Sequence, residues 1–136
     1  MTYEFTLDEL NDMLSDERWL IHQQGYRPDE NRVYETNFTL ANGYMGTRGL
    51  LEEGARNEYP GNFIAGVFDE ADDAAKSIVN TPHWLGLRLY IVNCPLTPDA
   101  CQVVAFERTL DMQKNVLFRR LQVKDKEGHE TLIEGY

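Results

Sequence analysis

Residues 34–49 read YETNFTLANGYMGTRG, and this stretch decides how we expect the chain to fold. Every second residue from Tyr34 to Leu40 would project from the same face of a sheet if the segment were extended. Asn42-Gly43 follows, and this dipeptide between extended runs is typical of a hairpin turn because both residues tolerate positive φ. Glycine recurs at every third position up to Gly49, which suggests a returning strand that bulges or lies close to other backbone. The stretch therefore predicts a β-hairpin.

The composition is that of one folded domain spanning residues 1–136. Hydrophobic residues make up 42% of the chain and charged residues 26%, and the length is sufficient for one hydrophobic core. Lys and Arg total 13 against 23 for Asp and Glu, a formal charge of −10. This negative charge would repel phosphate backbones and anionic lipid head groups, so we expect neither nucleic acid nor a membrane surface as a partner.

The first residues and the cysteines indicate a reducing compartment. The N-terminal MTYEFTLDELNDML lacks the basic start and unbroken apolar core of a signal peptide, so a cytoplasmic location is expected. Cys94 and Cys101 flank a loop that contains Pro95 and Pro98, and a bridge between them is geometrically conceivable. A pair of reduced thiols is the preferred interpretation, because nothing else indicates an oxidising compartment.

Short strands separated by turn signals account for most of the chain. Thr6 and Glu9 have the spacing of a capping box, which predicts a short amphipathic helix over about residues 7–14. Apolar or alternating runs predict further strands, and the alternation at 85–91 requires one buried face; these strands cover 19–22, 63–68, 85–91, 103–110, 116–123 and 131–133. The two runs on either side of 111–115 form a second hairpin. This pattern predicts an all-β fold, an antiparallel β-sandwich with a short N-terminal helix.

Catalytic motifs are not apparent. The two serines do not lie in a nucleophile elbow, the three histidines show no metal-ligand spacing, and the glycines match no phosphate-binding loop. We therefore predict no metal and no cofactor. A carboxylate pair for glycoside chemistry is defined by separation in space, so the sequence cannot choose among several glutamates, and surface positions are the usual case. The candidates are Glu35, Glu52, Glu53 and Glu107.

Trp84 follows His83 in the segment NTPHW, a composition suited to stacking on a sugar ring or on a partner's surface. Burial of Trp84 as a core anchor is the preferred interpretation. If the domain instead binds carbohydrate, Trp84 would be the stacking platform and the polar contacts would come from Asn42, Tyr44, Arg48 and His83.

The order of several segments is more specific than any single motif. Together they resemble the N-terminal domain of glycoside hydrolase family 65, which includes the maltose, trehalose and kojibiose phosphorylases. The similarity runs from about Trp19 to Thr131. It is carried by residues 19–21, 34–36 with 42–49, 63–69, 79–84 and 106–112.

The resemblance implies an N-terminal β-sandwich of the supersandwich, galactose-mutarotase-like type, followed by a helical linker, an (α/α)6 barrel and a small C-terminal β-domain. It also implies inverting chemistry, in which a barrel glutamate protonates the glycosidic oxygen while phosphate or water attacks the anomeric carbon. This chain includes none of the barrel, so we expect it to contain no catalytic residue and to be inactive alone.

The expected function is a non-catalytic module of a family 65 enzyme that acts on an α-glucoside disaccharide, with a role in assembly or in framing the active site. The chain looks like roughly the first half of the family's sandwich. Apolar strand faces would then be exposed, which favours a homo-oligomer, most simply a dimer, or contact with the helical barrel domain. The alternatives are a stand-alone carbohydrate-binding sandwich and an oligomerisation domain whose interface is the central hairpin.

Overall fold

The computed structural model describes residues 13–70 and 76–136, and its elements are two short 3-10 helices, one α-helix labelled α2 and eleven strands. The predicted helix at 7–14 falls almost entirely outside the described residues. The elements are η1 (Glu17–Trp19), β1 (Leu20–Gln24), η2 (Pro28–Glu30), α2 (Asn31–Asn37), β2 (Leu40–Ala41), β3 (Met45–Thr47), β4 (Asn62–Ile64), β5 (Phe68–Asp69), β6 (Ser77–Ile78), β7 (Tyr90–Ile91), β8 (Cys94–Pro95), β9 (Gln102–Asp111), β10 (Val116–Lys124) and β11 (Glu130–Gly135).

The largest sheet is antiparallel and has the strand order β1-β9-β10-β11. Its central hairpin, β9–β10, and its last strand, β11, confirm the strands predicted at 103–110, 116–123 and 131–133. Asp111 forms the β9–β10 turn, because its Oδ1 accepts hydrogen bonds of 3.0 Å from the backbone N–H groups of Gln113 and Lys114. The register shifts between Gln122 and Val123, which pair with Ala105 and Val103, so Val104 is the extra residue of a bulge in β9.

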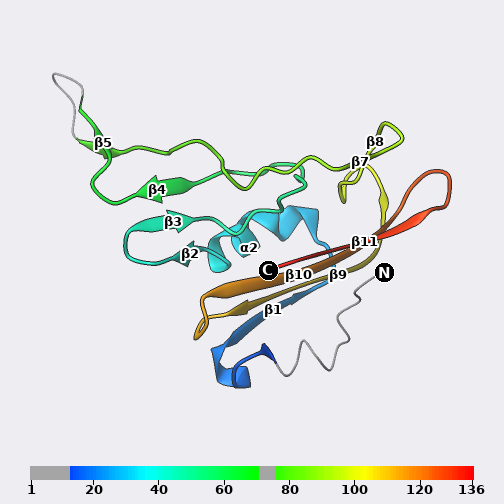
Figure 1. Cartoon of the computed structure of the whole chain (residues 1–136), viewed down its shortest axis with the longest axis horizontal. Coiled ribbons are helices and arrows are strands. Elements are labelled where there is room, and N and C mark those ends of the chain that lie inside the picture. Colours follow the sequence, from blue (N-terminus) through cyan, green and yellow to red (C-terminus); the bar gives the residue numbers. More distant parts are fainter. Residues whose placement is uncertain (1–12, 71–75) are drawn as a thin grey trace.

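A second layer, built from small antiparallel sheets, faces the four-stranded sheet, and α2 lies next to it (Figure 1). Its sheets are β2-β3-β4, β5-β6 and β7-β8. The two layers enclose a hydrophobic core, which confirms the predicted all-β sandwich. The core consists of Leu51, Leu96, Phe106, Leu121, Val123 and Ile133.

The hairpin at Asn42-Gly43 is confirmed, but its first strand is only Leu40–Ala41, and the extended run predicted from Tyr34 is wrong. Ala41 pairs with Gly46 across the turn, and Gly43 has a φ of 80°. The preceding residues form α2 instead, because the same sequence also satisfies helical spacing. The rings of Tyr34 and Phe38, four residues apart, stack with their centroids 5.8 Å apart.

The strand predicted over 85–91 is also wrong, because only Tyr90 and Ile91 pair with another strand. The backbone N–H of Leu87 donates instead to the carbonyl of Glu52 at 2.7 Å, and the Leu87 side chain is 48% exposed. The alternating leucines therefore belong to an irregular segment that follows the loop around Glu52. The run predicted at 63–68 is divided in a similar way into β4 and β5 by Gly66, whose φ is 82°.

Gly49 confirms the predicted close approach of two backbone segments. A Cβ atom at this position would lie 2.4 Å from the Phe38 Cβ and 2.5 Å from the Phe38 carbonyl oxygen. The Gly49 N–H donates to the Glu35 carbonyl at 3.0 Å, which fixes the chain against the end of α2. Only glycine allows this contact, and it sets the path of residues 49–53 between the two layers.

Candidate functional site

The β2–β3 hairpin carries a small groove. The Oδ1 of Asn42 accepts hydrogen bonds from the backbone N–H groups of Tyr44 and Met45, at 3.0 and 2.9 Å, and this holds the turn closed. Beside the turn lies a groove of about 140 Å³, lined by residues of β2 and β3 together with Trp84 and Asn115. Because Asn115 belongs to the β9–β10 turn, the groove lies between the two layers.

Two of the five predicted carbohydrate contacts meet in this groove, namely Asn42 and Trp84. Trp84 is 41% exposed, so its preferred interpretation as a core anchor is wrong. Tyr44 is 67% exposed at the hairpin tip but does not line the groove. The arrangement offers an accessible indole beside an amide side chain.

Arg48 and His83 lie elsewhere. An Nη2 of Arg48 donates to the Glu35 carboxylate at 3.3 Å and to the Arg32 carbonyl at 3.2 Å, so its charge is used inside the structure. His83 packs against Gly86, and its buried Nδ1 has no hydrogen-bond partner among residues 13–70 and 76–136. The structure thus divides the predicted set among different surroundings.

A row of polar residues crosses the inner face of the four-stranded sheet. Gln23, Arg108 and Arg119 occupy matching positions on β1, β9 and β10, next to Gly135 of β11, and we call these three residues the polar row. The Arg108 side chain is completely buried. A Cβ at Gly135 would lie 2.9 Å from the Arg119 Nε, so the glycine leaves room for that guanidinium.

The polar row holds residues 49–53 against the sheet. Arg108 donates through Nε to the Gln23 Oε1 and through Nη1 to the Gly49 carbonyl, each at 2.8 Å. Its guanidinium also lies 4.8 Å from the centroid of the Phe38 ring. Burial lowers the pKa of Arg108 to about 10, which still leaves it charged at neutral pH. An arginine on the inward parity of an apolar strand was the sequence signal for this buried residue.

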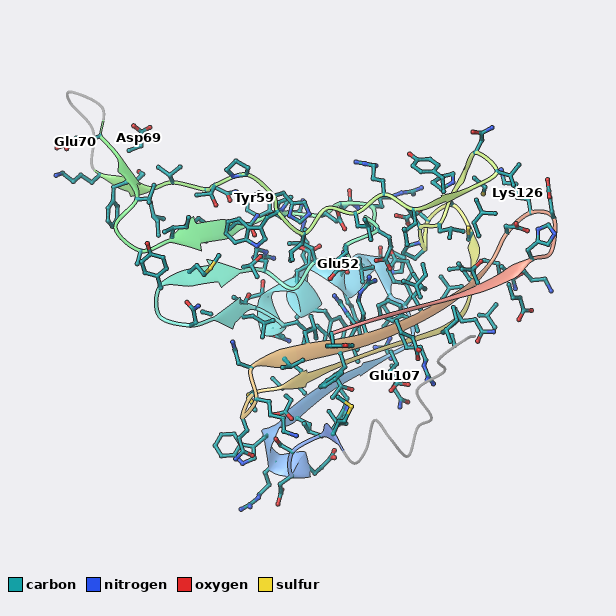
Figure 2. The ribbon with its side chains drawn as sticks, in the orientation of Figure 1. Glu52, Tyr59, Asp69, Glu70, Glu107 and Lys126 are labelled. Atoms are coloured by element: carbon teal, nitrogen blue, oxygen red, sulfur yellow. The ribbon has the colours of Figure 1, made fainter. Side chains whose placement is uncertain are left out.

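The glutamates proposed as possible catalytic acids are held in ion pairs or lie on different sides of the sheet. Glu53 is buried in an ion pair with Arg119, and Glu52 bonds to the same guanidinium at 3.1 Å. Figure 2 shows Glu52 between the layers and Glu107 on the opposite side of the four-stranded sheet. Buried Glu35 accepts a 2.8 Å hydrogen bond from Asn31. These contacts stabilise the interior and do not assemble two acids around an open cavity.

Glu58, near Glu35 and Glu53, was not singled out from the sequence. Burial raises its pKa to about 7, and repulsion from the two neighbouring carboxylates acts in the same direction. A 2.7 Å hydrogen bond from the Ala55 N–H to its Oε1 partly opposes this shift. Glu58 therefore changes its charge near neutral pH.

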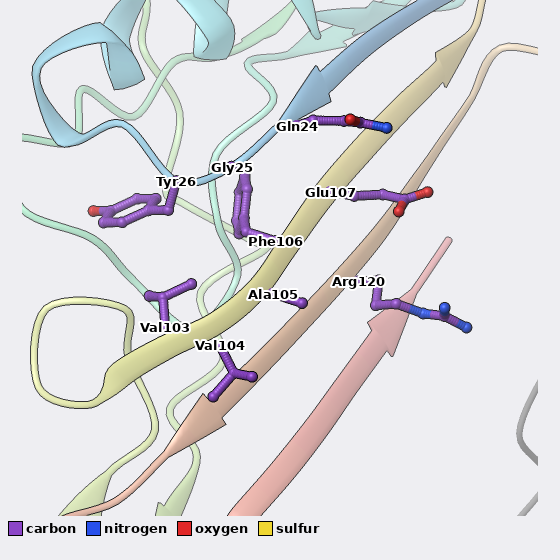
Figure 3. A pocket seen from close by; sticks show the side chains of 9 residues that line it. All are labelled: Gln24, Gly25, Tyr26, Val103, Val104, Ala105, Phe106, Glu107 and Arg120. Carbon is purple, nitrogen blue, oxygen red and sulfur yellow. The ribbon is translucent and has the colours of Figure 1, made fainter.

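A larger groove of about 530 Å³ lies at the β1 and β9 edge of the four-stranded sheet. Figure 3 shows Gln24, Glu107 and Arg120 projecting to one side of the strands and Tyr26 to the other. Arg120 forms an ion pair with Glu134 at 2.7 Å, so its charge is compensated across β10 and β11. The described residues contain no group of three His, Cys, Asp or Glu side chains arranged to hold a metal ion. None of the helices within those residues has the length and apolar character to span a bilayer.

The fold agrees with a comparison against protein families. Residues 21–135 match the N-terminal domain of glycosyl hydrolase family 65. The chain belongs to this family and corresponds to its N-terminal β-sandwich domain.

Individual relatives are named as kojibiose phosphorylases. The chain is 47% identical over 136 residues to kojibiose phosphorylase from Thermoanaerobacter brockii, covering all of this chain and 18% of that protein. It is 44% identical to the kojibiose phosphorylase of Caldanaerobacter subterraneus subsp. tengcongensis, covering 96% of this chain and 17% of that protein. A solved structure titled putative kojibiose phosphorylase from human microbiome has the same fold, with a TM-score of 0.76 and 21% identity over 89% of this chain and 18% of that one. The chain thus spans less than a fifth of the relatives it matches.

Proposed function

We propose that this domain is the N-terminal, non-catalytic module of a disaccharide phosphorylase that acts on kojibiose. The observation that carries the proposal is the 47% identity to a kojibiose phosphorylase over the whole chain, together with the family match over residues 21–135. Maltose and trehalose are the competing α-glucosides within the family. The 21% identical solved structure supports the fold alone and does not enter the choice of substrate.

The proposed division of labour places the bond cleavage outside this domain. Inverting cleavage of a glycoside requires an acid on one face of the sugar and room for phosphate or water on the other. Glu35 and Glu53 are each buried against an arginine, which leaves them unsuited to protonating a substrate. The general acid would belong to the helical barrel of the enzyme.

Phosphorolysis assays test this division. The purified 136-residue chain, incubated with phosphate and kojibiose, maltose or trehalose, is expected to release no glucose 1-phosphate. Full-length kojibiose phosphorylase from Thermoanaerobacter brockii serves as the positive control. Release of glucose 1-phosphate by the 136-residue chain would overturn the non-catalytic assignment.

The second layer supplies the surface for an assembly role. Apolar side chains on and beside β3, β5 and β6 are exposed where a sandwich normally covers them. They are Tyr44, Met45, Val67, Phe68, Ile78 and Trp84, which we call the hairpin-layer patch. Backbone bonds link these segments, since the Ala65 N–H donates to the Tyr44 carbonyl and the Val79 N–H donates to the Val67 carbonyl. We propose that the patch contacts the helical barrel domain or a second copy of the chain in a dimer.

Light scattering and melting experiments test the dimer. At micromolar concentration the chain should have the mass of a dimer, and Phe68→Glu should shift it toward the monomer. Leu132→Glu is the matched control, because Leu132 is an exposed apolar residue on β11, outside the hairpin-layer patch. A monomer that melts cooperatively would contradict self-association, and the patch would then be left to the barrel domain.

Carbohydrate binding in the groove beside the hairpin is a second candidate function, because Trp84 and Tyr44 are both exposed. A sugar ring would stack on the Trp84 indole and accept hydrogen bonds from the Asn42 amide. Trp19 is the other tryptophan and is also exposed, so Trp19→Phe leaves Trp84 as the reporter of fluorescence. Kojibiose should then quench that fluorescence in a saturable way. An unchanged signal at millimolar sugar would remove this candidate.

A further inference from the structure

The two cysteines of the chain are neighbours at the junction of the β7–β8 hairpin and β9. Cys94 lies in β8, and Cys101 immediately precedes β9. Both thiols point at one acceptor, the Pro95 carbonyl oxygen, which lies 3.9 Å from the Cys94 Sγ and 3.5 Å from the Cys101 Sγ. Burial raises the pKa of the Cys101 thiol, and the nearby Cys94 thiol acts in the same direction. The loop of residues 95–100 therefore brings together the only two sulfhydryl groups in the sequence.

Both cysteines are partly buried, but the two thiols have different surroundings. Cys94 lines a pocket of about 410 Å³, together with residues of the β7–β8 hairpin and of the turn between β10 and β11. Cys101 does not line this pocket and packs against the hydrophobic core cluster. Burial raises the pKa of the Cys101 thiol, which keeps it protonated. A small solute in the pocket would thus meet Cys94 first.

The charged residues of the pocket are Asp125, Lys126, Glu127 and His129. Asp125 is already occupied, because its carboxylate contacts the His129 ring at 3.0 Å and accepts hydrogen bonds from the backbone of Glu127 and His129. The carboxylate raises the pKa of His129, so this ring more readily carries a positive charge. Lys126 adds a second cation. Glu127 adds a second carboxylate, so the pocket that Cys94 lines contains charges of both signs.

We propose that Cys94 and Cys101 form a dithiol that hydrogen peroxide oxidises to a disulfide, with Cys94 as the attacking residue and Cys101 as the resolving residue. The Cys94 thiolate attacks one peroxide oxygen, and the O–O bond breaks to leave hydroxide. Sulfur is thereby oxidised to a sulfenic acid, and the hydroxide takes up a proton to become water. The Cys101 sulfur then attacks the Cys94 sulfur, and the S–O bond breaks. The departing oxygen leaves as water with the Cys101 proton, so two thiols and one peroxide give one disulfide and two waters.

The disulfide would join β8 covalently to the start of β9. The β7–β8 hairpin, which exposes Tyr90 and Val92, would then be fixed to the four-stranded sheet by a short closed loop. Oxidation is therefore expected to order this hairpin without unfolding the domain. This property does not depend on the proposed sugar chemistry.

Mass spectrometry of the 136-residue chain tests the proposal, because no other cysteine complicates the measurement. Treatment with hydrogen peroxide should remove two hydrogen masses from the intact chain and leave nothing for dimedone to trap. Cys101→Ser should instead accumulate a dimedone adduct on Cys94. Cys94→Ser should form no internal disulfide, and its remaining thiol should react about tenfold more slowly.

Three results would overturn the proposal. A wild-type chain that gains a dimedone adduct without losing two hydrogens would show that the thiols do not pair. Disulfide-linked dimers in place of the internal bridge would show that Cys94 and Cys101 of one chain do not pair with each other. Equal reaction rates of Cys94→Ser and Cys101→Ser would refute the order of attack. Circular dichroism of the reduced variants tests whether they fold. If either variant does not fold, the mass change of the wild-type chain alone decides whether the two thiols form an internal disulfide.

Discussion

Replacing Arg108 by alanine tests whether the polar row holds the two layers together. The substitution removes the two 2.8 Å hydrogen bonds to Gln23 and to the Gly49 carbonyl, and it leaves both acceptors in a buried site. It also removes the guanidinium 4.8 Å from the Phe38 ring. Residues 49–53 would then lose their main attachment to β9.

The expected loss follows from the contacts. Hydrogen bonds from a charged donor contribute about 1.5–3 kcal/mol each, and removing one member of a buried charged network costs about 3–5 kcal/mol. We expect Arg108→Ala to lower the free energy of unfolding by about 4 kcal/mol, a large share of the about 5–15 kcal/mol typical of a domain. For a chain of this size, that loss corresponds to a fall in melting temperature of about 10–20 °C.

Thermal and urea unfolding followed by circular dichroism measure this loss, with Arg120→Ala as the matched control. Arg120 is on the strand next to β9, but it pairs with Glu134 at a partly exposed site, where an ion pair contributes about 1 kcal/mol or less. If Arg108→Ala and Arg120→Ala lower the free energy of unfolding by amounts that agree within about 1 kcal/mol, the structural role given to the polar row is refuted.

Replacing Gly49 by alanine should cost about 2 kcal/mol in urea unfolding, because its Cβ would lie 2.4 Å from the Phe38 Cβ. Gly46→Ala is the control, since its Cβ would meet its nearest neighbour at 3.6 Å, and equal losses would contradict the packing argument. Burial raises the pKa of Glu58 from 4.5 to about 7, so its contribution to stability is complete below pH 4.5 and is lost as the pH rises through about 7. Glu58→Gln should therefore reduce the fall in melting temperature between about pH 5 and pH 8, while His129, whose pKa is also raised, acts equally in both proteins. If wild type and Glu58→Gln show the same dependence of melting temperature on pH, the contribution of Glu58 to the pH dependence of stability is excluded.

The sequence predicted best where one pattern admitted one structure. The two runs on either side of the Asp111 turn are long and bounded by turn signals, and the structure contains them as β9 and β10. The segment around Tyr34 satisfied the period of a strand and the spacing of a helix equally well. The buried hydrogen bond from Asn31 to Glu35, which supports the helix, is visible only in three dimensions.

The candidate site was less predictable, because its contacts join residues far apart in the chain. Trp84 and Asn42 meet in one groove, but Asn115 completes it from the β9–β10 turn, and no local pattern links these three. Arg48 is polar and follows the hairpin, which made it a candidate for a polar contact with carbohydrate. The ion pair with Glu35 sets the position of the Arg48 side chain. This ion pair depends on α2, because the helix places the Glu35 carboxylate next to Arg48.

The space that Gly135 leaves for Arg119 constrains how this domain can evolve. A side chain at position 135 would displace the guanidinium from the carboxylates of Glu52 and Glu53, whereas a shorter residue at position 119 would leave those carboxylates without their cation. Either change alone is costly, so the two positions should covary, with larger residues at 135 accompanied by smaller, uncharged ones at 119. Such exchanges should also bring neutral residues to positions 52 and 53. The residue at the end of β11 and the loop around residues 52–53 should therefore change together during evolution.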